Sequence, residues 1–300
     1  MLRKTIHYTE YFGITAKEVP FEDLDAYGDT KLFLDPHAIR IISGTEPYRS
    51  RAVDSIDTFL HCLTTRVLSH EKDSGDLLSH ISEPKETHLG LVCTGYSGHA
   101  GSDFIAQQIW LALTTDLEAL LKVGVLKHLE DLPLFVNGID RDITSDITMR
   151  VIFDVLVDFT HDCCSQYPEL NQHGTITLAK DVWDPIQRKW VERSYKLPAI
   201  DGMPFVLIPK GWCRKQLLGS ARRFFQIGSM GYIQQKQSRY DGVGKLLKPT
   251  KKMLKKQYSG SVRNTNVSAT STALGDNANI VEEFWKYVDE CYKAHIVKAA

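Results

Sequence analysis

The basic stretch from Lys210 to Lys256 constrains the fold more than any other part of the chain. It holds thirteen Lys and Arg residues against one acid, Asp241, so its local net charge is +12. The whole chain of 300 residues has a net charge of −1, which leaves the rest of the chain near −13. Burying unpaired charges is costly, so this stretch should lie at the surface. That surface should bind an anionic partner unless the acidic part of the same chain covers it.

Length and composition are those of a folded globular protein. A chain of 300 residues predicts one large domain, or one domain with a smaller appendage. The hydrophobic share of 43% is sufficient for a sizeable core. No apolar run approaches the roughly 18 residues that would cross a bilayer, and the first residues lack the apolar core of a signal peptide. The six cysteines are irregularly spaced, without a Cys-x-x-Cys pair. We therefore expect a cytoplasmic protein with reduced thiols and no membrane contact.

Hydrophobic periodicity predicts an α/β or α+β fold, with a mixed sheet flanked by long helices. Ile56, Phe59, Leu63 and Val67 recur at helical spacing, which indicates an amphipathic helix. Residues 188–197 alternate between apolar and polar side chains, as a half-exposed strand does. The expected strands cover 30–34, 88–94, 132–137 and a meander over 175–208. The expected long helices cover 50–69, 104–122 and 143–163.

Composition also divides the chain. Residues 1–258 are expected to form a single core that includes the basic segment 210–256. Residues 259–277 are rich in Ser, Thr, Asn and Gly and almost uncharged, which is typical of a flexible linker. Residues 278–300 carry an apolar face that includes Phe284 and Val288, which predicts a tethered amphipathic helix.

The basic stretch predicts contact with nucleic acid, because aromatic residues are interleaved with its cations. Lys and Arg neutralise phosphates, and aromatic rings stack on bases. The stretch could instead be a solvated face, or could dock on a protein partner, on the chain's own acids or on lipid. The residues expected to bind nucleic acid are Arg214, Lys215, Arg222, Arg223, Phe224, Lys248, Lys251, Lys252, Lys255 and Lys256.

Four carboxylates are candidates for a metal site that would cleave phosphodiester bonds. Asp35 ends an apolar strand, and Asp140, Asp142 and Asp146 lie at the turn into a long helix. Carboxylate oxygens are the ligands that Mg²⁺ or Mn²⁺ prefers, and a Lys such as Lys210 could stabilise the transition state. The alternative is structural, because Asp is a favoured helix cap and turn residue.

Two further patterns are candidates for charge recognition. Gly95, Gly98 and Gly101 lie between an expected strand and helix, where free N–H groups could bind an anion or simply form a turn. Asp154, Asp158 and Asp162 lie four residues apart on an expected helix, so their charges repel along one stripe. Such a stripe should face a basic partner or a cation.

We therefore expect a cytosolic nucleic-acid-binding protein that could be a metal-dependent nuclease. The alternative is a non-catalytic subunit of a larger assembly or homo-oligomer, which would dock through the basic segment and the C-terminal helix.

Overall fold

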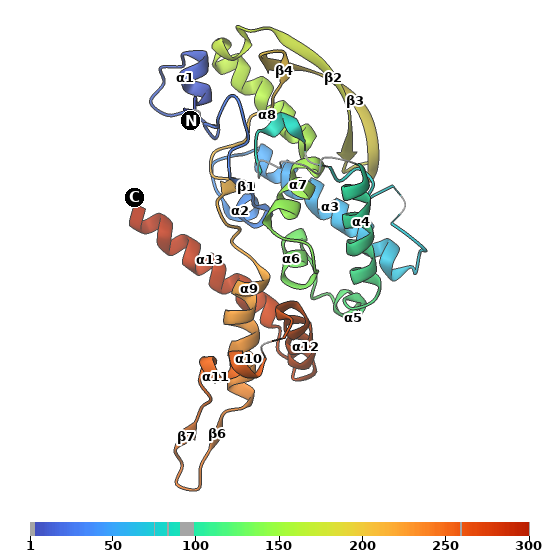
Figure 1. Cartoon of the computed structure of the whole chain (residues 1–300), viewed down its shortest axis with the longest axis vertical. Coiled ribbons are helices and arrows are strands. Elements are labelled where there is room, and N and C mark those ends of the chain that lie inside the picture. The colour runs from blue at the N-terminus through green and yellow to red at the C-terminus, as the bar shows by residue number, and fades with distance from the viewer. Residues whose placement is uncertain (1–3, 75, 83, 91–98, 259, 300) are drawn as a thin grey trace. The chain divides into compact units, whose positions relative to one another are not determined.

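The computed structural model describes residues 4–74, 76–82, 84–90, 99–258 and 260–299 (Figure 1). The chain forms two compact units. Unit 1 combines residues 1–107 and 140–217, and unit 2 combines residues 108–139 and 218–300. The division falls inside the basic stretch and inside the segment 1–258 that we expected to be a single core.

Unit 1 contains the longer strands of the chain and confirms the α/β class. Its strands pair antiparallel in two separate small sheets, β1–β5 and β2–β3–β4, rather than in one mixed sheet. The strands are β1 (Phe33–Leu34), β2 (Thr175–Asp184), β3 (Lys189–Ile200), β4 (Met203–Pro204) and β5 (Cys213–Arg214). The α-helices within this unit are α1 (Tyr8–Phe12), α2 (Pro36–Ile41), α3 (Tyr48–Leu68), α7 (Arg141–Val151) and α8 (Phe153–Gln166), and Lys85–Thr87 and Pro168–Asn171 form 3-10 turns.

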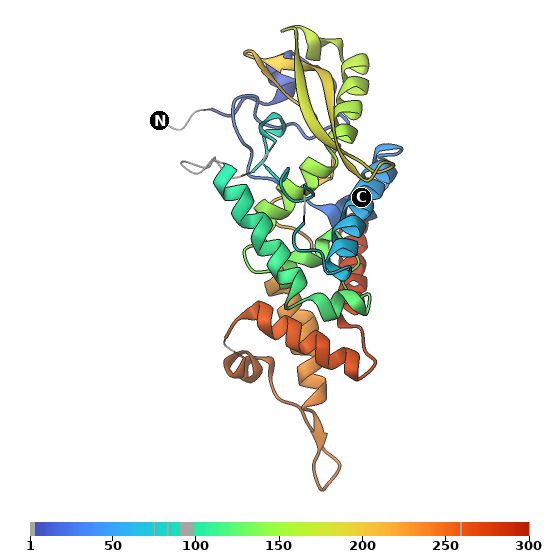
Figure 2. The same ribbon diagram turned by 90° about the vertical axis from the view of Figure 1, so that its right-hand side faces the viewer.

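The β2–β3 hairpin curves along α8 in both views (Figures 1 and 2). Its register pairs Trp183 with Trp190, and both rings are buried. The ring of Phe59 on α3 lies edge-on to Trp183, with 5.3 Å between the ring centroids. The expected helix 50–69 and the expected meander therefore form one core, since α3 buries the apolar face that its periodicity predicts.

Unit 2 is mainly helical, and its described strands form a single two-stranded hairpin, β6 (Arg239–Tyr240) with β7 (Leu246–Leu247). The hairpin extends beyond the helices of this unit in both views (Figures 1 and 2). A π-helical turn, Phe225–Ser229, joins two of its helices, and Leu129–Asp131 is a 3-10 turn. The α-helices are α5 (Glu118–Lys122), α6 (Leu132–Phe135), α9 (Ala221–Phe224), α10 (Met230–Lys236), α11 (Lys251–Gln257), α12 (Val262–Gly275) and α13 (Ile280–Ala299), and α4 (His99–Thr114) crosses the boundary between the units.

A buried amide holds the helices of unit 2 together. Asn266 on α12 is fully buried, and its amide nitrogen donates to the carbonyl oxygens of Leu134 (2.8 Å) and Ala221 (3.0 Å). Its amide oxygen accepts from the hydroxyl of Ser229 at 2.8 Å. Every bond therefore joins α12 to a different segment. Because a buried polar group without partners is costly, this arrangement specifies how the helices pack.

Two expected elements of unit 2 were wrong. Residues 132–135 form helix α6 where we expected a strand. Most of the expected flexible linker, 259–277, is helix α12. This helix buries small residues, including Ala269, Thr270 and Ala273, so it packs closely without the apolar stripe that identifies a buried helix in a sequence.

The expected C-terminal helix is confirmed as α13, but its apolar face is not free. Phe284 packs on Phe224 with 5.3 Å between ring centroids, and the indole nitrogen of Trp285 donates to the buried carboxylate of Asp131 at 2.7 Å. Since these side chains are buried within unit 2, α13 is part of its core rather than a tethered appendage.

Among the described residues, none of the helices has the length and apolarity that a bilayer crossing requires. The described cysteines that are assigned as free thiols are Cys62, Cys163, Cys164, Cys213 and Cys291. Burial raises the pKa of the Cys163 thiol to about 12 and that of Cys164 to about 11, so both are protonated at neutral pH.

Candidate functional site

The residues expected to act together fall into two different units. Lys210, Arg214 and Lys215 belong to unit 1, whereas Arg222 and all later cations of the basic stretch belong to unit 2. The basic stretch is therefore two separate sets of cations, and each has its own surroundings.

In unit 1, the segment that carries Lys210 and Arg214 is bound to two carboxylates. The backbone N–H of Gly211 donates to the carboxylate of Glu22 at 2.7 Å, and the N–H of Asp35 donates to the carbonyl oxygen of Trp212 at 3.0 Å. Arg214 Nε lies 4.0 Å from Asp35 Oδ2. Gly211 has φ of +89°, and a Cβ there would lie 2.4 Å from the side chain of Ile42, so only glycine fits this close turn.

Glu22 is a charged residue of this cluster that the sequence did not reveal. Burial raises the pKa of its carboxyl group, while the N–H of Gly211 and the charges of Lys210 and Arg214 lower it by smaller amounts. Burial, together with the charges of Glu22 and Asp35, also raises the pKa of the Cys213 thiol well above its ordinary value. No motif joins positions that lie almost 190 residues apart in the chain, so only the fold could identify this cluster.

Two of the candidate metal ligands cap helices. The carboxylate of Asp35 accepts from the N–H groups of His37 (3.0 Å) and Ala38 (3.2 Å) at the start of α2. The carboxylate of Asp140 accepts from the N–H of Asp142 at 3.0 Å at the start of α7. Asp35 and Asp140 therefore act as helix caps, because each carboxylate accepts from backbone N–H groups that have no partner inside the helix. This is the structural role that the sequence offered as the alternative to metal binding.

The structure brings the helix of Asp140, Asp142 and Asp146 beside the strand that leads into Asp35. The N–H of Leu34 donates to the hydroxyl of Ser145 on α7 at 2.9 Å, and the guanidinium of Arg141 lies 4.7 Å from the ring centroid of Phe33. Even so, the described residues include no group of three His, Cys, Asp or Glu side chains that could hold a metal ion. The Mg²⁺ or Mn²⁺ site therefore stays a prediction from the sequence.

The acidic stripe of unit 1 has partners in its own unit. Asp154 pairs with Arg193 at 2.7 Å and accepts from the hydroxyl of Tyr195, Asp158 pairs with Arg51 at 2.6 Å, and Tyr48 donates a hydrogen bond to Asp162. The stripe spans α8 alone, because the expected single helix is interrupted at Ile152 between α7 and α8. Arginines from α3 and β3 thus relieve the repulsion along the stripe.

In unit 2, most cations of the basic stretch have no acidic partner among the described residues. Among the ten Lys and Arg residues of 218–258, all of which the structure describes, Lys236 alone makes an ion pair with a described acid, Asp276, at 2.6 Å. We call the other nine the unpaired cations; they are Arg222, Arg223, Arg239, Lys245, Lys248, Lys251, Lys252, Lys255 and Lys256.

Helix α11 presents four of the unpaired cations on one face. Thr250 caps the helix by accepting from the N–H of Met253 at 3.2 Å, as the Pro-Thr sequence predicts. Leu254 is buried, whereas the four lysines of this helix are exposed. At 100° per residue the lysines span about 140° opposite Leu254. We call Lys251, Lys252, Lys255 and Lys256 the α11 lysines.

The one acid of this stretch closes the β6–β7 turn. The carboxylate of Asp241 accepts from the N–H groups of Val243 (3.0 Å) and Lys245 (2.8 Å). Gly244 adopts φ of +80°, which the tight turn requires. Because Asp241 is bound to its own backbone, it forms no ion pair with the neighbouring cations among the described residues.

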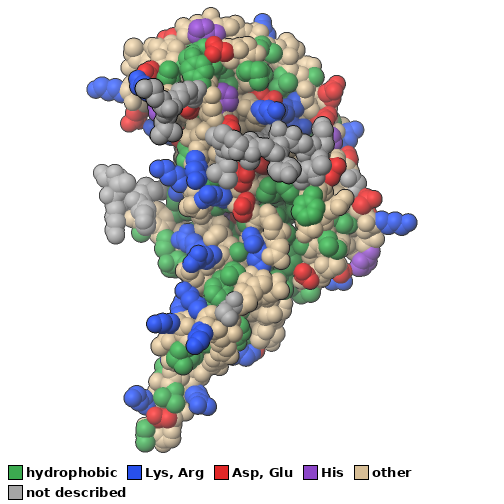
Figure 3. All heavy atoms as spheres, viewed as in Figure 1, with side chains coloured by type: hydrophobic (Ala, Val, Ile, Leu, Met, Phe, Trp, Pro, Cys, Tyr) green, Lys and Arg blue, Asp and Glu red, His purple; other side chains and the backbone are tan. Residues whose placement is uncertain are grey.

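Of the aromatic side chains near the unpaired cations, Tyr240 on the hairpin is exposed, whereas Phe224 on α9 is buried. Phe224 is 0% exposed and packs between Phe135 and Phe284, so its ring cannot stack on a base, and that prediction was wrong. Tyr240 is 73% exposed and Val243 at the turn is 89% exposed. Figure 3 shows Lys and Arg side chains gathered along the hairpin beside these apolar groups. An exposed apolar set bordered by cations is typical of a contact surface.

Residues 95–98 of the expected anion-binding loop lie outside the described residues, and helix α4 begins at His99.

Comparison with known proteins supplies a family. No curated protein and no solved structure matches the sequence significantly. Residues 13–219 match a family model described as Domain of unknown function (DUF8370). The match ends two residues into the second segment of unit 2, so α9 to α13 and the unpaired cations lie beyond it. Because the match covers more than half of the chain, the protein belongs to the DUF8370 family.

Proposed function

We propose that unit 2 binds nucleic acid through the unpaired cations of α11 and of the β6–β7 hairpin. The observation that carries the proposal is the absence of ion pairs at nine of ten cations across 218–258, within the part of the chain that the structure describes. A polyanion with regularly spaced phosphates can neutralise such a set, and the release of its counterions drives the association.

Two features favour nucleic acid over a solvated basic face. The α11 lysines share one exposed face of a capped helix, so several phosphates can be bound at once without reorganising the helix. Tyr240, on the neighbouring hairpin, exposes an aromatic ring between cations, and such a ring stacks on bases of any sequence.

The proposed binding does not depend on cleavage of the nucleic acid. The four candidate metal ligands include two helix caps, and no metal-binding group occurs among the described residues. Binding by lysines requires no metal. We therefore expect nucleic-acid binding to persist when divalent ions are removed with a chelator.

The test is the salt dependence of oligonucleotide binding by the full chain. Fluorescence anisotropy with a labelled DNA of mixed sequence should give an affinity that falls steeply from 50 to 200 mM salt. Each phosphate neutralised by a cation steepens the slope of log K against log salt by about 0.9 on duplex DNA. Replacing the four α11 lysines (Lys251→Gln, Lys252→Gln, Lys255→Gln, Lys256→Gln) should reduce the slope by about 3–4 if each contacts a phosphate.

A charge-matched variant controls for net charge. Replacing four exposed lysines of unit 1 with Gln (Lys17, Lys31, Lys72 and Lys189) removes the same charge and should leave the slope nearly unchanged. Equal weakening in both variants would overturn the assignment to α11. No binding of any oligonucleotide at 50 mM salt would overturn the proposal and favour a protein partner for the same surface.

A further inference from the structure

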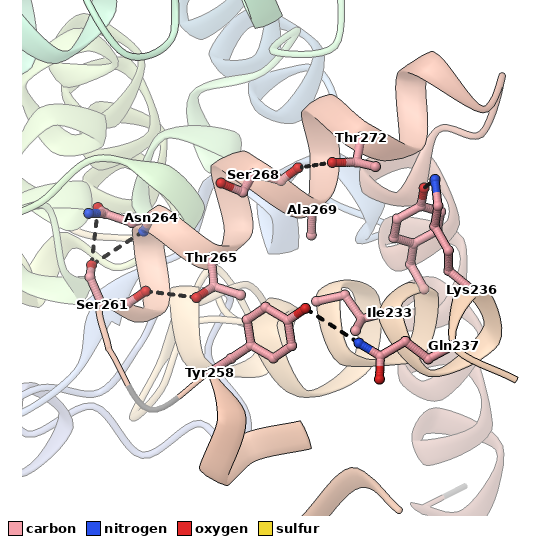
Figure 4. A pocket seen from close by; sticks show the side chains of 11 residues that line it. Ile233, Lys236, Gln237, Tyr258, Ser261, Asn264, Thr265, Ser268, Ala269 and Thr272 are labelled. Carbon is pink, nitrogen blue, oxygen red and sulfur yellow. Dashed lines mark hydrogen bonds between the residues drawn. The ribbon is translucent and has the colours of Figure 1, made fainter. Parts of the chain in front are cut away.

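A cavity of about 340 Å³ lies in unit 2 beside the end of the basic helix α11 (Figure 4). Its walls come from α10 and α12, and the ring of Tyr258 lies between them, near Thr265 of α12 and near Gln237, which directly follows α10. Tyr258 directly follows α11, so one residue of the cavity wall is continuous with the helix that carries the α11 lysines.

The lining of the cavity combines an apolar base with neutral polar groups. Ile233 and Ala269 are buried, whereas Asn264, Ser268 and Gln237 are exposed and present amides or a hydroxyl. No carboxylate is among the described residues that line it. One cation, Lys236, lines it, and that charge is paired with Asp276. The cavity therefore matches a flat, uncharged group that carries hydrogen-bond donors and acceptors.

A nucleobase has these properties. Its face stacks on an aromatic ring such as that of Tyr258, and its edge can bond the amide of Gln237 and the amide nitrogen of Asn264, whose oxygen already accepts from the hydroxyl of Ser261 at 3.1 Å. The amide of Gln237 donates to the hydroxyl of Tyr258 over 3.5 Å, a long hydrogen bond that a base edge could replace at little cost. Tyr258 is half-buried, so part of its ring stays accessible.

The position of the cavity relative to α11 indicates which form of nucleic acid would use it. Lys255 and Lys256 precede Tyr258 by three and two residues, which is about 3–4.5 Å along a helix axis. Helix α11 is held to α10 by the amide of Gln234, which donates to the carbonyl oxygen of Pro249 at 2.6 Å. A base can enter a cavity beside its own phosphate only when it is unpaired, because pairing holds the edge and stacking holds the face inside a duplex.

We propose that this cavity binds an unpaired nucleobase, so that unit 2 prefers single-stranded nucleic acid. The inference rests on the proposed function and adds the class of substrate. The α11 lysines hold the phosphates, and Tyr258 with the amides of Asn264 and Gln237 holds one base.

An abasic strand separates this inference from the proposed function. The full chain is titrated with a labelled oligothymidylate, with an abasic strand of equal length and with a duplex of equal length, at one salt concentration. We expect the oligothymidylate to bind roughly 5- to 150-fold more tightly than the abasic strand, the range for stacking of one base on an aromatic ring. Tyr258→Ala should remove most of this difference and leave only the part that Tyr240 on the hairpin supplies, and Tyr258→Phe, which keeps the ring, should retain most of it.

The controls make each outcome decisive. Thermal unfolding checks that both variants fold, and Ser268→Phe, at an exposed position, fills the cavity without removing Tyr258. Equal affinity for all three ligands in the wild type would overturn the inference and leave the proposed function standing. Loss of the base preference in Tyr240→Ala, but not in Tyr258→Ala or Ser268→Phe, would overturn it in favour of the hairpin. No binding of any ligand would mean that the proposed function itself has failed.

Discussion

Unit 1 holds 20 basic and 27 acidic residues, whereas unit 2 holds 16 basic and 10 acidic ones, so their net charges are −7 and +6. The two units also differ in how those charges are used. In unit 1, Lys180 pairs with Glu86, Arg193 with Asp154, and Arg51 with Asp158. In unit 2, six of the nine unpaired cations lie on the exposed face of α11 and on a hairpin whose one acid closes a turn.

The difference separates structural charges from charges available to a partner. An ion pair that is shielded from solvent stabilises a fold only while both partners are present. Removing one partner therefore lowers the free energy of unfolding. An exposed, unpaired lysine contributes little to stability, so its loss is felt in the binding of an anion. The two units should therefore respond to the same type of substitution in opposite ways.

The largest expected effect is on the Lys180–Glu86 pair of unit 1. Lys180 Nζ lies 2.5 Å from Glu86 Oε2 and 4.6 Å from the ring centroid of Phe153, with side chains 16% and 12% exposed. Burial lowers the pKa of Lys180, and Glu86 opposes that shift. Lys180→Met should reduce the free energy of unfolding by about 3–5 kcal/mol, because it leaves Glu86 without its cation.

Chemical denaturation measures this effect, and two variants control it. Glu86→Gln added to Lys180→Met should recover part of the loss, because the unpaired charge is removed. Lys252→Met on α11 should change stability by less than about 0.5 kcal/mol. Similar losses in Lys180→Met and Lys252→Met would contradict the distinction between the two units.

The sequence predicted the elements with a strong pattern. The apolar spacing of α3, the alternation of β3 and the amphipathic α13 all reappear in the structure. In each case one residue pattern identifies both the element and its buried face.

The remaining features depend on tertiary contacts that a local pattern cannot contain. The sequence of helix α12 resembles that of a linker, because the helix packs through Asn266 and small residues and so lacks an apolar stripe. Phe224 follows two arginines in the sequence, which predicts a ring that stacks on bases, yet its side chain lies in the core. No sequence pattern identifies Glu22, because its hydrogen-bond partner Gly211 is distant in the sequence. The charge of the basic stretch was visible in the sequence, but its division between two units was not.

A smaller effect compares two helix caps, one in each unit. Asp140 caps α7 in unit 1, and Thr250 caps α11 in unit 2. Replacing either with Ala should cost about 1 kcal/mol of stability, the usual value for a lost cap. Thr250→Ala alone should also weaken nucleic-acid binding, because a frayed α11 no longer holds its lysines on one face.

Denaturation and anisotropy on the two cap variants check this prediction, and Thr250→Ser, which keeps the hydroxyl, serves as the control. The same proteins test the nuclease expected from the sequence. Cleavage that requires Mg²⁺ or Mn²⁺ and disappears in Asp140→Ala or Asp146→Ala, with folding intact, would establish the carboxylates as metal ligands. It would also show that unit 1 is catalytic as well as structural.

The smallest effect concerns Glu22, where the charges of unit 1 are incompletely balanced. Burial raises the pKa of this carboxyl group above its ordinary value of 4.5, although Lys210 and Arg214 oppose the shift. The folded state therefore binds the proton more tightly than the unfolded state does. The resulting stabilisation is fully present below pH 4.5 and is lost as the pH rises through the folded-state pKa. Ionised Glu22 thus opposes folding at neutral pH.

Glu22→Gln removes this charge and keeps an oxygen that can accept from the N–H of Gly211. Its stability relative to the wild type should be higher at pH 7 than at pH 4, as measured by denaturant midpoints at both values. A variant that is relatively less stable at pH 7 would show that ionised Glu22 is a net stabilising partner of Lys210 and Arg214. Those two cations would then belong with the paired charges of unit 1. The predicted sign instead means that they compensate a half-buried acid only in part, while the α11 lysines of unit 2 pair with no acid among the described residues.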